Sequence, residues 1–406
     1  MMFDTGTTAF MILSTSLVML MTPGLAFFYG GLAGKRNILG IMMQTFVSLG
    51  ITTIMWVTVG YSLCFSGGLG GIIGNLDLAF LTGVPFGQSF AGADGKYPEY
   101  IFIAYQMMFA IITPALITGA FVNRVSFKGY LIFLVFWQLF VYYPFVHMIW
   151  GGGIMAEWGV LDFAGGIVVH ATAGFAALAS VFYVGSRRDN QSPPNSIPLV
   201  AIGTGLLWFG WYGFNAGSEL QVDAITTLAF LNTDVAASFA AITWLIIEWI
   251  KTGKPKFVGL LTGAVAGLAT ITPAAGFVPL WAAMLIGIAA GSICFIAVHY
   301  KNKFGWDDAL DVWGVHGIGG VLGTISLGVF AMSAVNGQSG LIEGDFTFFF
   351  TEVIAVVIGA LYAFLFTYLM LAVINLITPV KVKEEEEDSG LDFAIHCERA
   401  YDEGAL

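Results

Sequence analysis

The sequence predicts an all-α integral membrane protein with eleven transmembrane helices. Of its 406 residues, 58% are hydrophobic and only 10% are charged, whereas a soluble domain carries about 25% charged residues. Apolar runs of about 20 residues, long enough to cross a hydrocarbon layer roughly 30 Å thick, follow one another almost from end to end. Basic residues gather in alternate connections between these runs. These observations leave no room for a sizeable soluble domain.

The expected spans follow the apolar runs in chain order. They lie at residues 8–32, 39–66, 99–122, 129–150, 163–185, 197–217, 228–250, 257–274, 279–299, 312–334 and 344–378. The first four residues include no Lys or Arg, and no small-residue cleavage site closes the first run, so we expect a retained helix and not a signal peptide. We divide the chain into a membrane domain over residues 1–378 and a C-terminal tail over residues 379–406.

The basic residues predict the orientation, because cytoplasmic loops collect Lys and Arg. With these spans, alternate connections and the tail hold every basic residue except Lys96. We therefore expect a multi-pass protein of the cell membrane with its N-terminus outside and its C-terminus in the cytoplasm. This orientation requires an odd number of spans.

Other features of the composition exclude several classes of site. Without a basic patch, nucleic-acid binding is not expected. The three cysteines, Cys64, Cys294 and Cys397, are scattered, which indicates free thiols and not a disulfide framework or metal cluster. We expect no metal, no cofactor and no enzymatic activity. The acidic run from Glu384 to Asp388 is typical of a solvated segment.

The 52 glycines are concentrated within the spans. Small residues at three- and four-residue spacing let helix backbones approach closely in lipid. Close packing leaves little space for a wide aqueous channel, so any pore is expected to be narrow.

Two histidines lie deep within expected spans, His170 in the fifth and His316 in the tenth. Ionisable side chains are expensive in a membrane, which makes both functional candidates. Each follows an aspartate, a favoured helix N-cap: Asp162 precedes His170 by eight residues, and Asp311 precedes His316 by five. At about 1.5 Å per residue, His170 and His316 lie about 12 Å and 8 Å from the N-terminal starts of their helices, which begin at opposite faces of the membrane. Antiparallel matched helices indicate an inverted repeat of spans one to five and six to ten, with span eleven outside it.

Two roles are open for these histidines. Each could be a buried side chain bonded to a nearby backbone carbonyl. Alternatively, two facing neutral rings share a hydrogen bond and form a polar line through an apolar tube. Because imidazole titrates at about pH 6.5, this pair of rings could also hold or pass a proton.

Aromatic residues form a second group near the expected outer ends of spans. Trp150 alone would be read as an interface anchor. Together with Phe109, however, its ring face could hold a small cation, a contact worth about 2 kcal/mol or more once desolvated. Ser218 could add a hydroxyl acceptor, and acidic outer loops would raise the local cation concentration.

Long motifs around these residues resemble the ammonium transporter family, the Amt/Mep/Rh group, and its Amt type in particular. The most specific matches are Asp162–His170, Gly210–Ser218, Asp307–Gly317 and the tail from Gly390 to Tyr401. The resemblance extends from Pro23 into the tail. Two departures are Tyr105, where the family often has Phe, and Cys397, where Gly is common.

The resemblance implies a homotrimer of eleven-span subunits, each with one pore and an inverted five-helix repeat. It assigns Trp150, Phe109, Ser218 and Asp162 to substrate binding, Phe109 and Phe214 to a gate, and His170, His316 and Trp211 to the pore. It also implies ammonium, ammonia and methylammonium as substrates. A PII-type regulatory protein would dock at the cytoplasmic face.

The predicted function is conduction of ammonium, as ammonia with a proton, through a pore with two histidines. Dehydrating an ion of this size costs about 20 kcal/mol in the Born limit, and ammonium, unlike potassium, escapes that barrier by losing a proton. The main alternative is an ammonium sensor that signals through the tail. A haem protein using the deep histidines, and a general cation channel, which would need a carboxylate ring or carbonyl filter, are further alternatives.

Overall fold

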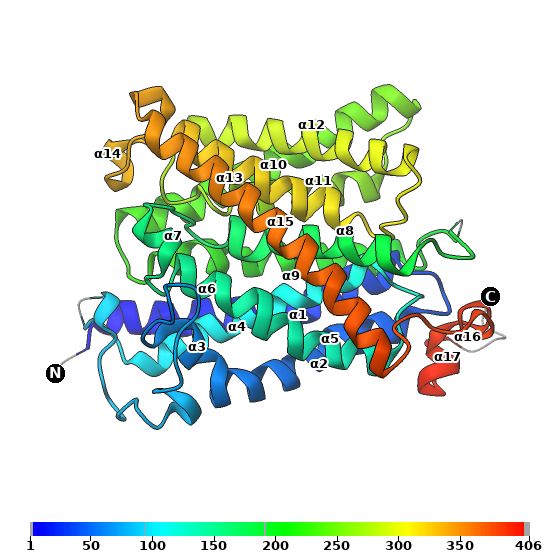
Figure 1. Ribbon diagram of the computed structural model, residues 1–406. Helices are drawn as coiled ribbons and strands as arrows, with labels where there is room; N and C mark the ends of the chain where they lie inside the picture. Colours follow the sequence, from blue (N-terminus) through cyan, green and yellow to red (C-terminus); the bar gives the residue numbers. More distant parts are fainter. Residues whose placement is uncertain (1–2, 94, 191, 402–406) are drawn as a thin grey trace.

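The computed structural model describes residues 3–93, 95–190 and 192–401, and it is a bundle of helices (Figure 1). Within these residues no β-strand forms, and only isolated bridges occur. Ten helices in this described part of the chain are long and apolar enough to cross a membrane. The all-α prediction is therefore confirmed. The expected tail is described as far as Tyr401, and its last five residues lie outside the described part of the chain.

The helices of the bundle coincide with the expected spans. In chain order they are α1 (Thr5–Leu32), α2 (Ile38–Met55) continued by η1 (Trp56–Gly60) and α3 (Tyr61–Phe65), α4 (Glu99–Ile117), α5 (Phe127–Trp137) continued by η5 (Gln138–Tyr142) and α6 (Tyr143–Ile149), η6 (Gly166–Ala171) with α8 (Thr172–Val184), α9 (Ile197–Ala216), α10 (Ala224–Thr252), α11 (Phe257–Ile271), α12 (Leu280–Lys303), η8 (Trp313–Gly317) with α13 (Ile318–Phe330), and α15 (Phe346–Ile377). Short elements complete the described chain: η2 (Ala79–Leu81), η3 (Ala91–Ala93), η4 (Thr118–Ala120), α7 (Ile154–Glu157), η7 (Gly217–Glu219), α14 (Ser333–Asn336), η9 (Leu341–Glu343), α16 (Glu384–Ser389) and α17 (Leu391–His396).

Helix α11 is the exception among the expected spans. It has 15 residues, which at 1.5 Å per residue gives a length of about 22 Å. That is less than the roughly 30 Å of a hydrocarbon core. Helix α11 is therefore too short to be counted among the ten long helices, although it is also apolar.

Polar caps determine where several helices begin. Asp4 accepts the Thr7 N–H at the start of α1, at 2.6 Å. Asp223 accepts N–H groups at the start of α10, and Asp345 accepts the Phe348 N–H of α15 at 2.9 Å. These side chains satisfy N–H groups that have no partner inside the helix. The apolar runs therefore begin as helices at defined residues.

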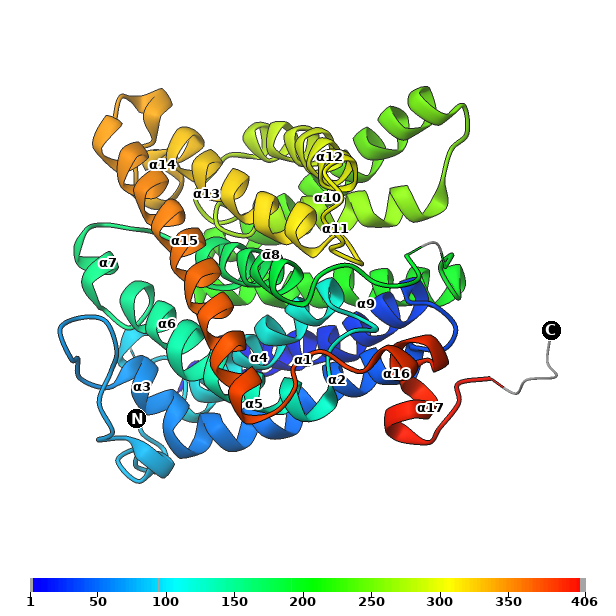
Figure 2. The same cartoon turned by 45° about the vertical axis from the view of Figure 1, so that its right-hand side comes forward.

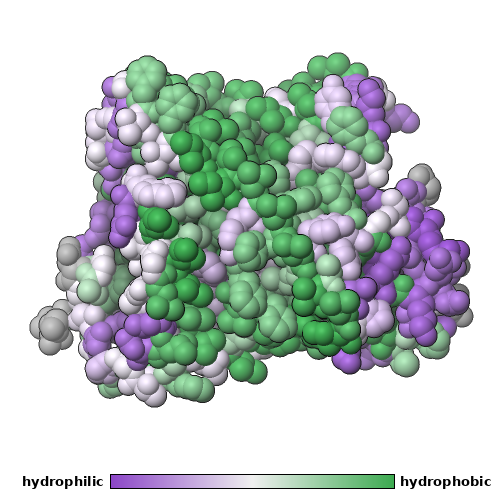
Figure 3. Space-filling view, in the orientation of Figure 1, coloured by the Kyte–Doolittle hydropathy of each residue, from purple (hydrophilic) through white to green (hydrophobic). Residues whose placement is uncertain are grey.

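The two ends of the bundle differ in charge. The tail lies at one end and the N-terminus at the other, and α15 runs diagonally between these ends across the face of the bundle in both views (Figures 1 and 2). We call the tail-bearing end the basic end, because it carries Lys35, Arg36, Arg124, Arg187, Arg188 and Lys301. Apolar residues form a broad band between hydrophilic edges (Figure 3). This distribution fits a protein that lies in a membrane with its two ends in water.

The tail is held against the basic end. Asp392 accepts the N–H groups of Ile38 and Gly40 at 3.0 and 2.8 Å, which caps α2, and the Leu391 N–H donates to Asn37 at 2.9 Å. Burial raises the pKa of Asp392, although these N–H groups act in the opposite direction. The tail is thus part of the folded protein up to Tyr401.

The acidic run is not simply solvated, which corrects the expectation from sequence. Arg188 donates to Glu384 at 2.5 Å and to Asp388 at 2.8 Å, and its backbone N–H donates to the buried Glu387 at 2.7 Å. A basic loop between distant spans reaches the run in space. Arg188 and the acidic run lie almost 200 residues apart in the chain. The local sequence pattern around either one therefore does not reveal that they pair.

Close helix packing brings the two histidine-bearing helices together. A Cβ placed on Gly174 of α8 would collide with the backbone of Gly317 in η8. A Cβ on Gly320 would lie 3.0 Å from the Cβ of His170. Only glycine permits this separation, as expected for small residues at helix crossings in membranes.

Candidate functional site

His170 and His316 face each other in the centre of the bundle. Their Nδ1 atoms lie 3.3 Å apart, and their rings are stacked with centroids 5.2 Å apart at 21°. Both side chains are almost fully buried. Because neutral imidazole has one donor and one acceptor, one ring donates its Nδ1 proton to the other. The Nε2 atom of His170 is buried and has no hydrogen-bond partner within the described chain.

Each histidine belongs to a short π-helical segment, η6 for His170 and η8 for His316. Such segments are rare in helices and are frequent at functional sites. The wider turn places each ring away from the regular helical position.

Asp162 caps the first of these segments as expected. Its carboxylate accepts the N–H groups of Gly165, Gly166, Ile167 and Val168 at 2.8, 2.6, 2.8 and 3.0 Å. All four N–H groups at the start of η6 are therefore satisfied by one buried side chain.

The second cap is Asp308 and not Asp311, which corrects the sequence-based expectation. Asp308 accepts the N–H groups of Val312 and Trp313 at 3.1 and 2.7 Å. Asp311 lies at the end of a turn with φ of 61°, and its carboxylate binds Lys301. Asp308 precedes His316 by eight residues, the same separation as between Asp162 and His170. This equal spacing is the feature of the sequence that could have identified Asp308 as the second cap.

The aromatic residues meet beside Asp162 and His170. The Phe109 and Phe214 rings are 4.3 Å apart at 33°, and Trp150 meets Phe109 edge-on at 5.9 Å. The indole N–H of Trp150 donates to the carbonyl oxygen of Asp162 at 2.8 Å. The residue that caps the histidine helix therefore also orients the Trp150 ring.

Ser218 lies beside this aromatic group, and Tyr105 holds it. The Ser218 hydroxyl donates to the Phe214 carbonyl at 2.8 Å. The Tyr105 hydroxyl lies 3.2 Å from Ser218 Oγ and 2.9 Å from the carbonyl oxygens of Gly213 and Phe214. The sequence drew attention to Tyr105 only as an aromatic residue. Its hydroxyl is the functional group that links α4 to the Ser218 turn.

Rings continue from the aromatic group to the histidines. Phe214 and Trp211 both stack on His170, with centroids 6.0 and 5.5 Å away. The Trp211 indole donates to Thr272 Oγ1 at 2.9 Å, which fixes its orientation. Sequence reasoning missed Thr272, because a lone threonine within an apolar run carries no distinguishing signal.

The cavity beside the histidines is very small. Its volume is about 10 Å³, and its lining is apolar except for His170 and His316. That is room for about one water-sized molecule. A hydrated cation does not fit there.

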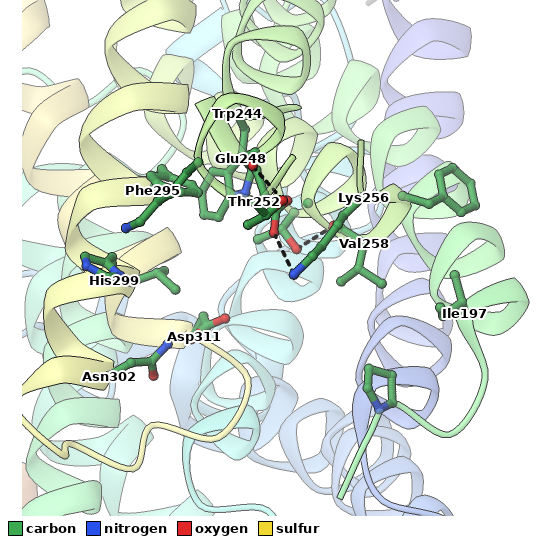
Figure 4. A pocket seen from close by; sticks show the side chains of 16 residues that line it. Ile197, Trp244, Glu248, Thr252, Lys256, Val258, Phe295, His299, Asn302 and Asp311 are labelled. Carbon is green, nitrogen blue, oxygen red and sulfur yellow. Dashed lines mark hydrogen bonds and ion pairs between the residues drawn. The ribbon is translucent and has the colours of Figure 1, made fainter. Parts of the chain in front are cut away.

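Two larger cavities open at the basic end. The first, which we call the inner vestibule, has a volume of about 250 Å³ and reaches from His316 to Arg187 and Asp311. The second, the side chamber, has a volume of about 630 Å³ and is lined by α10, α11 and α12 (Figure 4). Pro194, Val258, Thr262 and Asp311 line both cavities, so the two adjoin. The small cavity beside the histidines shares Phe28, Val265 and His316 with the inner vestibule, so these two cavities adjoin as well.

Asp307 organises the loop beside the inner vestibule. It binds Arg187 at 2.6 Å and Arg124 at 3.4 Å. Burial alone would raise the pKa of Asp307, but the hydrogen bond from Arg187 and the charge of Arg124 outweigh it and lower the pKa. Burial in turn lowers the pKa of Arg124 to about 10, which the charge of Asp307 opposes. Both groups are ionised at neutral pH.

Nothing in the described part of the chain is arranged as a metal centre. No three His, Cys, Asp or Glu side chains among these residues lie close enough together to hold an ion. The described site therefore consists of an aromatic group, a histidine pair and two capping aspartates.

Comparison with known proteins agrees with the resemblance seen in the sequence. A profile of the Ammonium Transporter Family matches residues 9–401. The chain is 44% identical to an ammonium transporter of Bacillus subtilis over 98% of both chains. It is 42% identical to ammonium transporter Amt1 of Archaeoglobus fulgidus, over 98% of this chain and 99% of the relative. The crystal structure of Candida albicans Mep2 is similar with a TM-score of 0.88 at 34% identity, covering 95% of this chain and 88% of that one.

Proposed function

The chain belongs to the ammonium transporter family, and on this premise we propose that it conducts ammonium past His170 and His316, as ammonia accompanied by a proton. The observation that carries the proposal is the buried histidine pair, with Nδ1 atoms 3.3 Å apart, beside a cavity of only about 10 Å³. Such a space accepts ammonia and excludes a hydrated ion.

Substrate capture takes place at the aromatic group. An ammonium ion lies over the Trp150 and Phe109 rings, where cation–π attraction is strongest after partial loss of water. Ser218 Oγ keeps a lone pair for the ion, since its proton is donated to Phe214. The buried Asp162 carboxylate adds negative potential beneath the site. The backbone carbonyl oxygen of the same residue accepts the Trp150 indole N–H and orients the ring.

Selectivity follows from deprotonation. The Phe109 and Phe214 rings close the path below the capture site, and a dehydrated cation would meet a barrier of about 20 kcal/mol in the Born limit. Ammonium loses one proton and enters as ammonia, whereas potassium has no proton to lose. The free Nε2 of His170 accepts a hydrogen bond from ammonia. The proton passes along the paired imidazole nitrogens.

The arrangement in the membrane is also part of the proposal. Eleven spans include the short α11, with the N-terminus outside and the basic end in the cytoplasm. Spans one to five and six to ten form an inverted repeat, which is supported by Asp162 and Asp308 capping matched helices that enter from opposite ends. The membrane domain covers residues 1–378 and the cytoplasmic tail covers 379–406.

The assembly and partners that we propose rest on family membership. They are a homotrimer with one pore per subunit, methylammonium as a second substrate, and a PII-type regulatory protein at the basic end. One similar structure is titled Sensor Amt Protein, with a TM-score of 0.87 and 29% identity over 95% of this chain and 97% of that one. Up to Tyr401 the tail forms only α16 and α17. Transport is therefore the function that we favour over sensing.

The test is current recorded on a solid-supported membrane carrying proteoliposomes of the full chain. Ammonium and methylammonium are expected to give currents, and potassium none. A potassium current of similar size would contradict selectivity by deprotonation. Uptake without current would contradict the accompanying proton. The double variant H170L/H316L, in identical lipid, is the control for leakage.

A further inference from the structure

The two capping aspartates have different electrostatic surroundings. Asp162 is bound by four backbone N–H groups, and no Lys or Arg forms an ion pair with it within the described chain. At the basic end, Lys301 Nζ donates to the Asp308 carbonyl oxygen and to Asp311 Oδ1, both at 2.5 Å. The two halves of the inverted repeat therefore have equivalent capping aspartates, Asp162 and Asp308. Among the described residues, only the basic-end half has a lysine, Lys301, beside its cap.

The ammonium group of Lys301 lies against two oxygen ligands at the basic end. Lys301 extends from the end of α12 to the loop that leads into η8, and only 2% of the residue is exposed. Asp311 lines both the inner vestibule and the side chamber, where Figure 4 places it near Asn302 and His299. Its carboxylate is a third exposed and so reaches the exit path from the pore. Without Lys301, the Asp308 carbonyl oxygen and the Asp311 carboxylate would lose this partner next to that exit.

We propose that Lys301 is a tethered substitute for the transported ion, occupying the basic-end counterpart of the ammonium capture site. Its primary ammonium group presents N–H donors of the same kind as ammonium itself. While it occupies this position, an ion that leaves the pore finds the Asp308 carbonyl oxygen and the Asp311 carboxylate already bound. Cation capture is thus confined to the end that carries Trp150. This inference rests on the proposed function. It concerns the end of the pore at which ammonium is captured.

The physical basis is competition for one set of oxygen ligands. Hydrogen bonds to charged groups contribute about 1.5–3 kcal/mol each, which corresponds to roughly tenfold or more in affinity. A tethered group is always present at the site, whereas a free ion must be bound from solution. Ammonium at the basic end therefore cannot displace Lys301 at moderate concentration.

The experiment compares Lys301→Met with wild type and with Lys303→Met. Methionine keeps most of the side-chain volume and removes the charge. Lys303 is the matched control, because it lies on the same helix, is exposed, and places its Nζ 5.9 Å from the Tyr300 ring and not on a carboxylate. Full-length protein is reconstituted, and protease cleavage of the tail reports orientation. Ammonium chloride is added to the basic-end side while current from the opposite side is measured.

In Lys301→Met, basic-end ammonium is expected to inhibit the current at about one-tenth of the concentration required in wild type. Ammonium, and not sodium, should also raise the melting temperature of this variant more than that of wild type or Lys303→Met. Lys301→Arg keeps the charge and should resemble wild type. The double variant K301M/D311N, which loses the charged acceptor, should lose most of the added ammonium sensitivity. Equal responses in all five proteins would overturn the proposal.

Removal of Lys301 could also prevent folding, since it leaves the partly buried Asp311 carboxylate without its ion-pair partner. In that case the yield of monodisperse Lys301→Met protein is compared after purification in ammonium chloride and in sodium chloride. Recovery in ammonium alone supports the tethered-ion role, and equal loss in both salts overturns it. A wild-type protein that carries no ammonium current would instead refute the proposed function. The two failures are therefore distinguishable.

Discussion

The Nδ1 atoms of His170 and His316 lie 3.3 Å apart, and the two residues come from antiparallel helices that are capped eight residues earlier by Asp162 and Asp308. The pair is thus supported from both ends of the bundle by buried carboxylates. Several measurable consequences depend on this geometry.

Replacing His170 by Glu or His316 by Leu is expected to change selectivity between ammonium and potassium. An acid stabilises a cation in the pore, and an apolar side chain interrupts the line of nitrogens that passes the proton. Currents in ammonium and in potassium are measured for each variant. His299→Leu is the control, since His299 is exposed on α12. Selectivity equal to wild type in both pore variants would refute the role of the pair.

Tyr105→Phe is expected to weaken substrate capture and to leave maximal transport nearly unchanged. The Tyr105 hydroxyl holds the Ser218 turn through contacts of 2.9 to 3.2 Å. A hydrogen bond of this kind is worth about 1 kcal/mol, so the half-saturating ammonium concentration should rise about fivefold. Concentration series of the current measure both quantities. A lower maximal current at constant half-saturation would show that Tyr105 acts elsewhere.

Gly174→Ala is expected to destabilise the protein strongly. The added Cβ would collide with the backbone of Gly317 and push the two histidine helices apart. Overpacking of this kind costs about 1–3 kcal/mol. Thermal unfolding followed by size-exclusion chromatography measures the loss. Gly205→Ala is the matched control, because a Cβ there meets nothing within 4 Å, and its melting temperature should not fall.

Asp307 is expected to make the loop at the basic end sensitive to acid. Its pKa is below the usual value in the folded protein, so its stabilising contribution is complete above the unfolded pKa, about 3.9. That contribution is lost as the pH falls through the lower folded pKa. Melting temperatures between pH 3 and pH 7, roughly, should fall more steeply in acid for wild type than for Asp307→Asn. Parallel curves for the two proteins would contradict this role.

Much of the fold follows from the apolar pattern alone. The expected spans at 8–32 and 344–378 coincide with α1 and α15, and the basic connections collect at one end as predicted. Both results come from a one-dimensional rule, because the solvent around each segment determines its composition. His170 and His316 could be singled out for the same reason, since an ionisable residue is conspicuous in an apolar run.

Other features depended on which distant side chains meet. The sequence suggested Asp311 as the second cap, but its φ of 61° turns its carboxylate to Lys301, and Asp308 takes the helix N-terminus. The acidic run near Glu384 offered no sign of its partner Arg188. The short length of α11 was hidden because its apolar run continues beyond the helix into the following turn.

The sequence by itself determined that the chain crosses a membrane many times, which end is basic, and that two deep histidines require an explanation. Only the tertiary structure decided that these histidines touch, that Asp308 matches Asp162, and that Lys301 occupies the charge cluster at one end alone. The reason is physical. Solvent preference is a property of each residue, whereas hydrogen bonds and ion pairs are properties of atoms that the folded backbone brings within about 3 Å.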